Sequence, residues 1–76
     1  MSKEQIFITD TLLSGVVNLI IENKNVSIQE ALNILYNSET YKKIIDTETG
    51  LYIQSADYNY EVLEEELSGG NKIYLI

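Results

Sequence analysis

The 76-residue chain contains no cysteine, histidine, tryptophan, proline or arginine. Because Cys and His are absent, the usual zinc fingers, haem ligation, a thiol nucleophile and an imidazole base are all excluded. Without Arg there is no bidentate clamp for a phosphate group. The 12 acidic and 5 basic residues give a net charge of −7, which would repel a nucleic-acid backbone. We therefore expect no nucleic-acid partner, no metal and no cofactor.

The sequence also lacks the usual signals for export and for membrane insertion. Residues 1–5 contain neither the basic start nor the small-residue cleavage site of a signal peptide. Asp10, Ser14 and Asn18 interrupt the most apolar stretch, so no unbroken run approaches the roughly 20 residues of a membrane span. The absence of Cys fits a reducing compartment. These features predict a cytoplasmic protein with no membrane partner.

Aliphatic residues are abundant: 24 of the 76 residues are Ile, Leu or Val. A hydrophobic content of 45% is too high for a disordered acidic tail. A chain of this length forms one domain, and it should bury only about 60% of the surface that its unfolded chain exposes. We expect a single, mainly α domain of three or four helices over residues 1–76. Residues 69–76 would form a tail or a strand in a minor β pairing.

A first helix is predicted from about Lys3 to Glu22. Ser2 and Gln5 have the spacing of a capping box at its start. Its apolar residues span an arc of about 220° on a helical wheel, whereas a surface helix needs only about 100°. A short strand over residues 5–9 is the alternative, because this string is rich in β-formers. The wide arc predicts a homodimer whose interface consists of Leu12, Leu13, Val16, Val17 and Ile20.

A second helix is predicted to start after Ser27. Ser27 and Glu30 form an S-x-x-E capping box, and Val26 can pack on Ala31 as a hydrophobic staple. Apolar residues follow at helical spacing: Ile28, Ala31, Leu32, Leu35 and Tyr36. Asn37 and Ser38 should then interrupt the helix, with Ser38 capping a short helix over residues 39–46. A continuous, kinked helix is the alternative, because Ile34, Tyr41 and Ile45 could share one face.

The remaining sequence predicts a turn, an extended segment and a last helix. The turn covers residues 46–50, with Gly50 at a positive φ, and its acids lack the spacing of a calcium loop. Residues 51–53 should be extended. Ser55 should cap an acidic helix that runs to about Ser68 and ends at residues 69–70. Residues 72–76 could pair as a strand with residues 51–53 or 6–8, or remain an apolar tail that invites association.

Two groups of side chains are candidates for binding a partner. The first is a set of tyrosines, because Tyr anchors many binding surfaces; its members are Tyr36, Tyr41, Tyr52 and Tyr58. The alternative is that these rings fill the rim of a small core. The second is an acidic face of the last helix, which would suit a basic protein partner; its members are Glu61, Glu64 and Glu65, with Asp57 one turn earlier. The alternative is a solvated helix face.

Two motifs carry a resemblance to other proteins. The pattern A-L-x-x-x-Y-x-S-x-T-Y runs from Ala31 to Tyr41, and D-x-x-T-G-L-Y runs from Asp46 to Tyr52. With the flanking residues, the stretch from Ser27 to Leu67 resembles small uncharacterised bacterial proteins of about this size. Some of these are similar to products encoded near toxin–antitoxin modules. The resemblance implies no particular activity and assigns no catalytic residue.

The sequence therefore predicts a non-catalytic protein–protein interaction module that forms a homodimer through its first helix. A second hypothesis is an antitoxin-like or adaptor protein that presents its acidic last helix to a basic partner. An enzyme is the least favoured reading, because neither G-x-S-x-G nor S-x-x-K nor a Gly-rich phosphate loop is present. A carboxylate-based enzyme would need a pocket with two converging acids.

Overall fold

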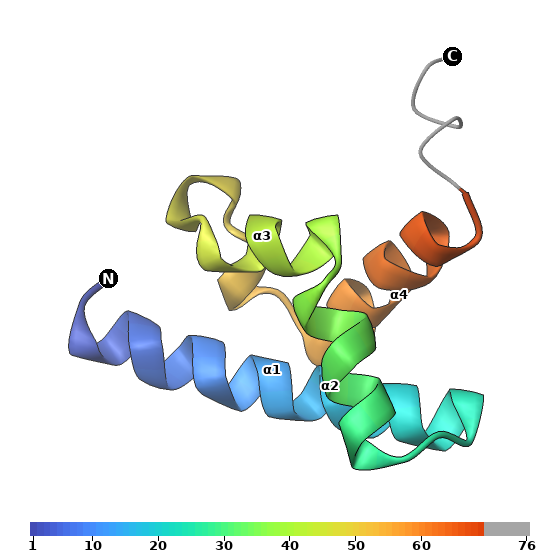
Figure 1. Ribbon diagram of the computed structural model, residues 1–76. Coiled ribbons are helices and arrows are strands. Elements are labelled where there is room, and N and C mark those ends of the chain that lie inside the picture. The colour runs from blue at the N-terminus through green and yellow to red at the C-terminus, as the bar shows by residue number, and fades with distance from the viewer. Residues whose placement is uncertain (70–76) are drawn as a thin grey trace.

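The computed structural model describes residues 1–69 of the chain (Figure 1). Over this range it is mainly α-helical and contains no strand, which confirms the predicted fold class. The predicted strand or tail at residues 72–76 lies outside the described residues. In chain order the elements are α1 (Lys3–Lys24), α2 (Ile28–Tyr36), α3 (Glu39–Ile45), the 3₁₀ turns η1 (Thr47–Thr49) and η2 (Leu51–Ile53), and α4 (Ala56–Leu67).

A serine begins each α-helix of the described range, as the sequence predicted. The hydroxyls of Ser2, Ser27, Ser38 and Ser55 each accept a hydrogen bond from the backbone N–H three residues later, at 3.0 to 3.1 Å. At Ser2 the capping box is complete, because its own N–H donates to Gln5 Oε1 at 2.8 Å. Residues 5–9 are therefore helical, and the alternative of a short strand there is wrong.

A break separates α2 from α3, so the predicted interruption at residues 37–38 is confirmed and the continuous helix is wrong. Ser38 has an extended backbone, and its hydroxyl donates to Leu35 O while accepting from Tyr41 N–H. These two bonds end one helix and start the next. The change of direction lets Ile44 of α3 reach the core that Leu35 of α2 also enters.

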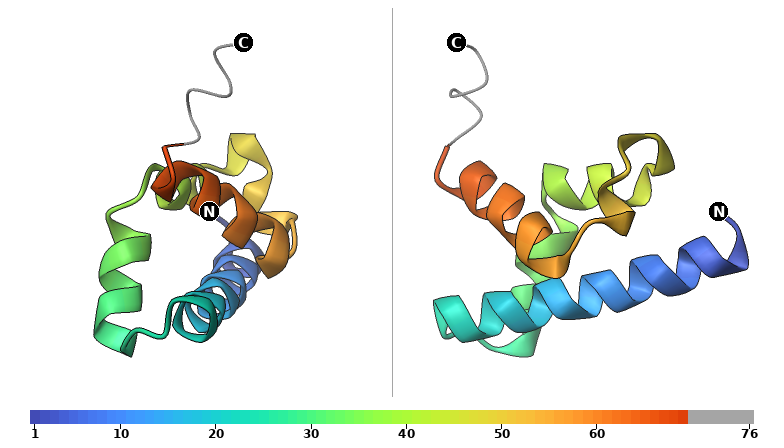
Figure 2. Two further views of the ribbon diagram at one scale, coloured as in Figure 1. Left: turned by 90° about the vertical axis from the view of Figure 1, so that its right-hand side faces the viewer. Right: turned by 180° about the vertical axis from the view of Figure 1, so that it is seen from behind.

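The longest helix, α1, forms the base on which the other elements pack (Figure 1). Seen nearly along α1, α2 lies on one side of it and α4 on another (Figure 2, left). The C-terminal half of α1 is crossed by α2, while its N-terminal half contacts η2 (Figure 1). The wide apolar arc of α1 is therefore covered on two sides, and the cover is less complete towards its N-terminus.

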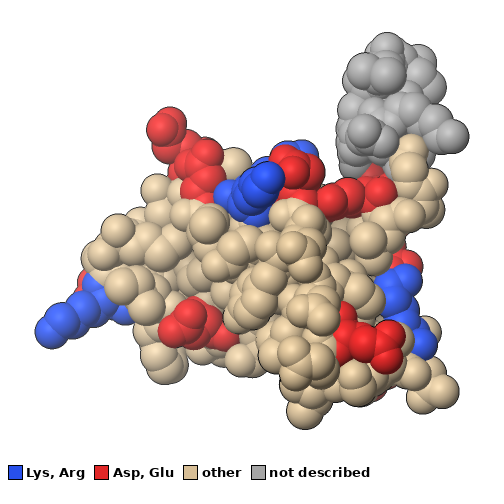
Figure 3. Space-filling model, in the orientation of Figure 1, with Lys and Arg blue, Asp and Glu red and all other residues tan. Residues whose placement is uncertain are grey.

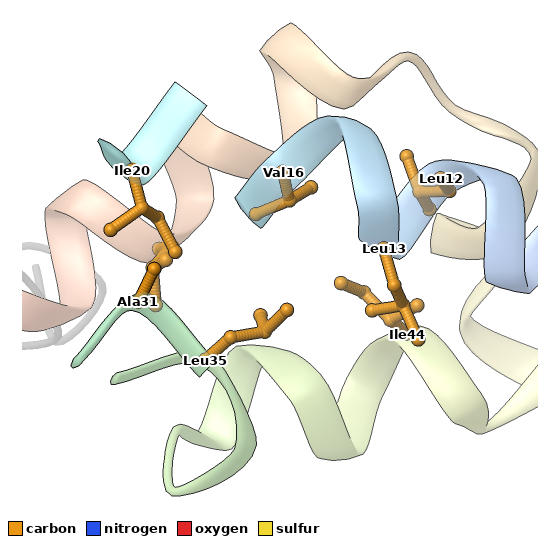
Figure 4. Close-up of a cluster of buried hydrophobic side chains, with 8 residues drawn as sticks. Leu12, Leu13, Val16, Ile20, Ala31, Leu35 and Ile44 are labelled. Carbon is orange, nitrogen blue, oxygen red and sulfur yellow. The ribbon is translucent and has the colours of Figure 1, made fainter. Parts of the chain in front are cut away.

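The core follows one stripe of α1 and draws on all four α-helices of residues 1–69 (Figure 4). Its members are Leu12, Leu13, Val16, Ile20, Ala31, Leu35, Ile44 and Leu63. Fully burying a Leu, Ile or Val side chain contributes about 1.5–3 kcal/mol relative to leaving it exposed. This stripe is narrower than the predicted arc: Val17 and Ile21 flank it half-buried, while Ile6 and Ile8 are exposed.

Residues 51–53 form a 3₁₀ turn, so the predicted extended segment is wrong. Gly50 precedes the turn with φ +73°, the positive value that the sequence predicted. The turn is held against α4 by Asn59, which is fully buried. Its Nδ2 donates to Leu51 O at 2.9 Å and to Ser55 O at 3.0 Å. These bonds fold the segment back against α4, which an extended strand would prevent.

Two contacts fix α4 against α1. Near the start of α4 its backbone lies close to that of α1. A Cβ added to Gly15 would lie only 2.9 Å from Ala56 Cβ. Near its end, Lys24 Nζ lies 2.8 Å from Glu64 Oε1. The hydrogen bond to Glu64 raises the pKa of Lys24, against a smaller opposing effect of burial. A glycine and an ion pair thus set how α4 crosses α1.

By length and composition, α1 is able to cross a membrane, and within residues 1–69 it is the one helix of which this holds. This differs from the expectation that Asp10, Ser14 and Asn18 would disqualify it. The core helix of a globular protein meets the same criteria. Five residues of α1 are buried within the fold, so part of its apolar surface serves the core.

Candidate functional site

Other parts of the same chain cover the residues that were predicted to form a dimer interface. Leu12, Leu13, Val16 and Ile20 are buried in the core, and the half-buried Val17 packs against them. Most of their surface is therefore covered within the chain and is not available to a second copy. Periodicity showed that this face of α1 is apolar, but α2, α3 and α4 of the same chain cover it.

The apolar surface that stays exposed lies at the N-terminal half of α1. Phe7 is 72% exposed and Ile53 of η2 is 64% exposed, with the partly exposed Ile8 beside them. Together with neighbouring residues they line an open depression with a volume of about 320 Å³, which we call the apolar groove. It is lined by Phe7, Ile8, Thr11, Leu12, Tyr52, Ile53, Gln54 and Ala56.

Two contacts hold the walls of the apolar groove in place. Gln5 Nε2 donates to the hydroxyl of Tyr52 at 3.1 Å, which ties the first turns of α1 to η2. The close approach of Gly15 and Ala56 fixes the end of the groove where α4 begins. All eight residues that line the groove are formally uncharged. The groove is thus an apolar surface that a partner can cover without desolvating an ion.

A second cavity, of about 370 Å³, lies between α1 and α2, and we call it the polar groove. One wall is a row of polar side chains at successive turns of α1, namely Asp10, Ser14 and Asn18. The rest of its lining consists of Leu13, Val17, Leu32 and Tyr36. The ring of Tyr36 packs edge-on against Tyr41, with centroids 4.9 Å apart and planes at 73°. Neither groove is lined by two acids.

The four predicted binding tyrosines do not form one surface. Tyr36 and Tyr41 are neighbours beside the polar groove, whereas Tyr52 lines the apolar groove. Tyr58 is partly exposed on α4 and lines neither of these cavities. The sequence therefore identified tyrosines at both grooves, but it did not show that they belong to two separate sites.

The acids of α4 differ in how far they are exposed to solvent. Glu64 pairs with Lys24, as described above. Glu61 and Glu65 of the predicted face are exposed, as is Asp57. On the face shown in Figure 3, acidic and basic side chains stand in small groups that adjoin one another in places, and most of the surface over α1 and α2 is uncharged. Glu64 of the predicted face thus serves the fold through its ion pair.

Glu66, which the sequence did not single out, binds the start of α3. Its carboxylate accepts hydrogen bonds from Glu39 N–H at 2.8 Å, Thr40 N–H at 2.9 Å and the Thr40 hydroxyl at 2.7 Å. Burial alone would raise the pKa of Glu66, but these three bonds, together with Lys43, lower it below its usual value. The one hint in the sequence was a third acid in the last turns of α4, where the helix dipole disfavours it.

Within residues 1–69 no group of three His, Cys, Asp or Glu side chains is placed to hold a metal ion. The carboxylate of Asp46 instead accepts from Glu48 N–H at 3.1 Å and caps η1. Comparisons of the chain with protein-family models, curated proteins and solved structures found no match. The two grooves are thus the features on which a function can be argued.

Proposed function

We propose that this chain is a non-catalytic interaction module that pairs with a second copy of itself through the apolar groove. The observation that supports this proposal is the position of Phe7, which projects into solvent at the edge of a cavity lined by uncharged residues. Exposed apolar clusters of this kind mark sites of protein association. A second copy of the chain can be the partner, because each copy carries both the exposed Phe7 and the apolar groove.

The shape of the apolar groove suits a symmetric contact. A two-fold dimer needs a self-complementary patch, in which a projection of each copy enters a cavity of the other. Phe7 is such a projection, and Ile8, Tyr52 and Ile53 form the cavity beside it. Because both lie on one patch, a two-fold contact closes on itself and gives a dimer. A filament would need two separate patches.

The charge distribution also favours this patch over the rest of the surface. The chain carries a net charge of −7, so two copies repel one another at a distance. The residues that line the apolar groove carry none of this charge. Contact through the groove therefore keeps the acidic side chains in water while it buries apolar surface, which is the main favourable term in association.

The predicted alternative, a basic partner bound to the acidic face of α4, has less support. Glu64 is paired with Lys24, and Glu66 binds the start of α3. The exposed acids Asp57 and Glu61 form an ordinary solvated helix face. We therefore place the self-association surface at the apolar groove.

The experiment compares two isoleucines of equal exposure. Ile53, in the apolar groove, and Ile28, at the start of α2, are both 64% exposed. We expect Ile53→Ser to weaken the dimer at least about tenfold, because burying an Ile contributes about 1.5–3 kcal/mol. Ile28→Ser should change the dimerisation constant by less than about twofold. Sedimentation velocity from 1 to 200 µM measures the constant, and circular dichroism checks that both variants fold.

Two results would count against the proposal. One is a wild-type chain that stays monomeric up to 200 µM. The other is an equal loss of dimer in the Ile28→Ser and Ile53→Ser variants, which would mean that the contact does not involve the apolar groove. Phe7→Ser offers an independent check, because it removes the projection on the same patch while leaving the core untouched.

A further inference from the structure

The polar groove presents side chains whose hydrogen-bonding capacity the described fold leaves unused. Among residues 1–69, the side chains of Asp10, Ser14 and Asn18 make no hydrogen bond or ion pair. Other polar residues of α1 behave differently: Thr11 donates to Phe7 O at 2.9 Å, and Asn23 to Leu19 O at 2.8 Å. Three available polar groups therefore line up along one wall of a cavity.

The charge of this wall is uncompensated. Within residues 1–69 the ion pairs are Lys24–Glu64 and Lys42–Glu39, so Asp10 has no basic partner there. No Lys lines the polar groove. Asp10 is exposed, so it attracts a cation as a surface carboxylate does, and the attraction is screened by salt. A ligand that complements the groove therefore carries a positive charge.

The remaining walls define what kind of cation fits. Leu13, Val17 and Leu32 supply an apolar surface, and Tyr36 supplies an aromatic ring that its contact with Tyr41 holds in position. A bare metal ion gains little from such walls. An Arg or Lys side chain uses all of them, because its methylene stem packs on aliphatic groups and its charged head is attracted to aromatic rings.

We propose that the polar groove binds an Arg or Lys side chain carried by a peptide segment of a basic partner protein. The charged head would pair with Asp10 and donate to the side-chain oxygens of Ser14 and Asn18. The stem would lie along Leu13 and Val17, beside the ring of Tyr36. A cavity of about 370 Å³ lies at the small end of ligand sites, so it suits one side chain and its neighbours.

This site is independent of the proposed self-association. The polar groove lies on the side of α1 that faces α2, whereas the apolar groove lies on the side that faces η2 and α4. Different residues of α1 line the two cavities, so a dimer could bind two basic segments. Failure of one proposal would leave the other unaffected, because each is tested with its own variants.

The test is a titration of the ¹⁵N-labelled chain with a peptide, in which NMR chemical shifts report binding. The probe is the peptide Ac-Gly-Leu-Arg-Leu-Gly-NH₂, whose leucines can contact the apolar wall, and the same peptide with Gln for Arg is the control. We expect shifts centred on Asp10, Ser14, Asn18 and Tyr36 and a dissociation constant of about 1 mM or tighter. The Gln peptide should bind at least about fivefold more weakly. Absence of binding at 10 mM would overturn the proposal.

A matched pair of charge variants separates a site from general attraction to an acidic protein. Asp10 and Asp57 are both exposed, and only Asp10 lines the polar groove. Asp10→Asn should weaken peptide binding at least about fivefold, whereas Asp57→Asn removes the same charge and should change it by less than about 1.5-fold, because salt screens distant charges. Equal losses in both variants would overturn the proposal.

A further arm separates a peptide from a free organic cation. Argininamide has the same head group but lacks the neighbouring leucines, so we expect it to bind at least about threefold more weakly than the peptide. Equal affinity would overturn the assignment to a peptide segment. Tyr36→Leu should also weaken binding of the peptide, because it removes the aromatic wall while keeping apolar bulk at that position.

Discussion

Glu66 shows how a carboxylate that looks like surface charge can hold a fold together. It lies in the last turn of α4, where the dipole of its own helix opposes a negative charge. Its oxygens nevertheless satisfy the N–H groups of Glu39 and Thr40, which the first turn of α3 leaves without partners inside the helix. Hydrogen bonds to a charged acceptor are stronger than neutral ones. The bond between helices therefore outweighs the unfavourable local dipole.

Replacing this residue should destabilise the fold. We expect Glu66→Gln to lower the free energy of unfolding by about 1–2 kcal/mol at pH 7, because a neutral amide is a poorer acceptor for two N–H groups and a hydroxyl. Glu61→Gln is the control: it removes the same charge from an exposed position of α4 and should change stability by less than about 0.5 kcal/mol. Urea denaturation gives both values. A Glu66→Gln variant as stable as the wild type would contradict this role.

The same carboxylate makes stability depend on pH. Its pKa is lower in the folded chain than in the unfolded one, so the folded state favours the charged form. That contribution is fully present above the unfolded pKa and is lost as the pH falls through the folded pKa. The difference in stability between wild type and Glu66→Gln should therefore shrink between roughly pH 5 and pH 3. A difference that stays constant over this range would argue that the variant acts through packing alone.

At the scale of elements, the contact between α1 and α4 depends on the absence of a side chain at Gly15. Gly in a helix interior normally costs about 0.5–1 kcal/mol relative to Ala. Here an Ala side chain would lie 2.9 Å from Ala56 Cβ, closer than two such atoms can approach. The helices would have to separate, which would disturb Val16 and Leu63 in the adjoining core.

A double-mutant cycle tests this contact. Gly15→Ala should destabilise the wild-type chain by about 1 kcal/mol, because the strain of overpacking exceeds the gain in helix propensity. In an Ala56→Gly background the added methyl has room, so the same change should stabilise the chain. Urea denaturation of the four proteins measures the coupling. Additive effects would show that Gly15 and Ala56 do not limit the approach of the helices.

How far the sequence predicted each element depended on how local its signal was. The serine caps and the break at residues 37–38 were predictable, because a cap satisfies N–H groups only three residues away. The turn at residues 51–53 was not, because Asn59 of the following helix holds it in place. The helical-wheel projection of α1 showed which face is apolar, but it did not show that α2 and α4 cover that face. Both grooves depend on how the helices cross, which no local pattern contains.

At the scale of the whole molecule, the two grooves should respond to salt in opposite ways. Self-association through the apolar groove brings together two chains of charge −7, so added salt weakens the repulsion. The polar groove binds an opposite charge, so salt should weaken that contact. We expect the dimer dissociation constant to fall about three- to tenfold between 20 and 500 mM NaCl, measured by sedimentation velocity. A dimer that dissociates as salt rises would indicate an interface held by ion pairs.

The ion pair between Lys24 and Glu64 has a consequence for how the chain folds as it is made. The two residues are 40 positions apart, so α1 is synthesised long before α4, one of the helices that cover it. At about 5–20 residues per second, the delay is roughly 2–8 s. During that interval α2 and α3 are made and can cover part of the apolar stripe of α1, but the side that α4 covers has no partner within its own chain. The order of synthesis thus exposes on a nascent chain the surface that the finished protein hides.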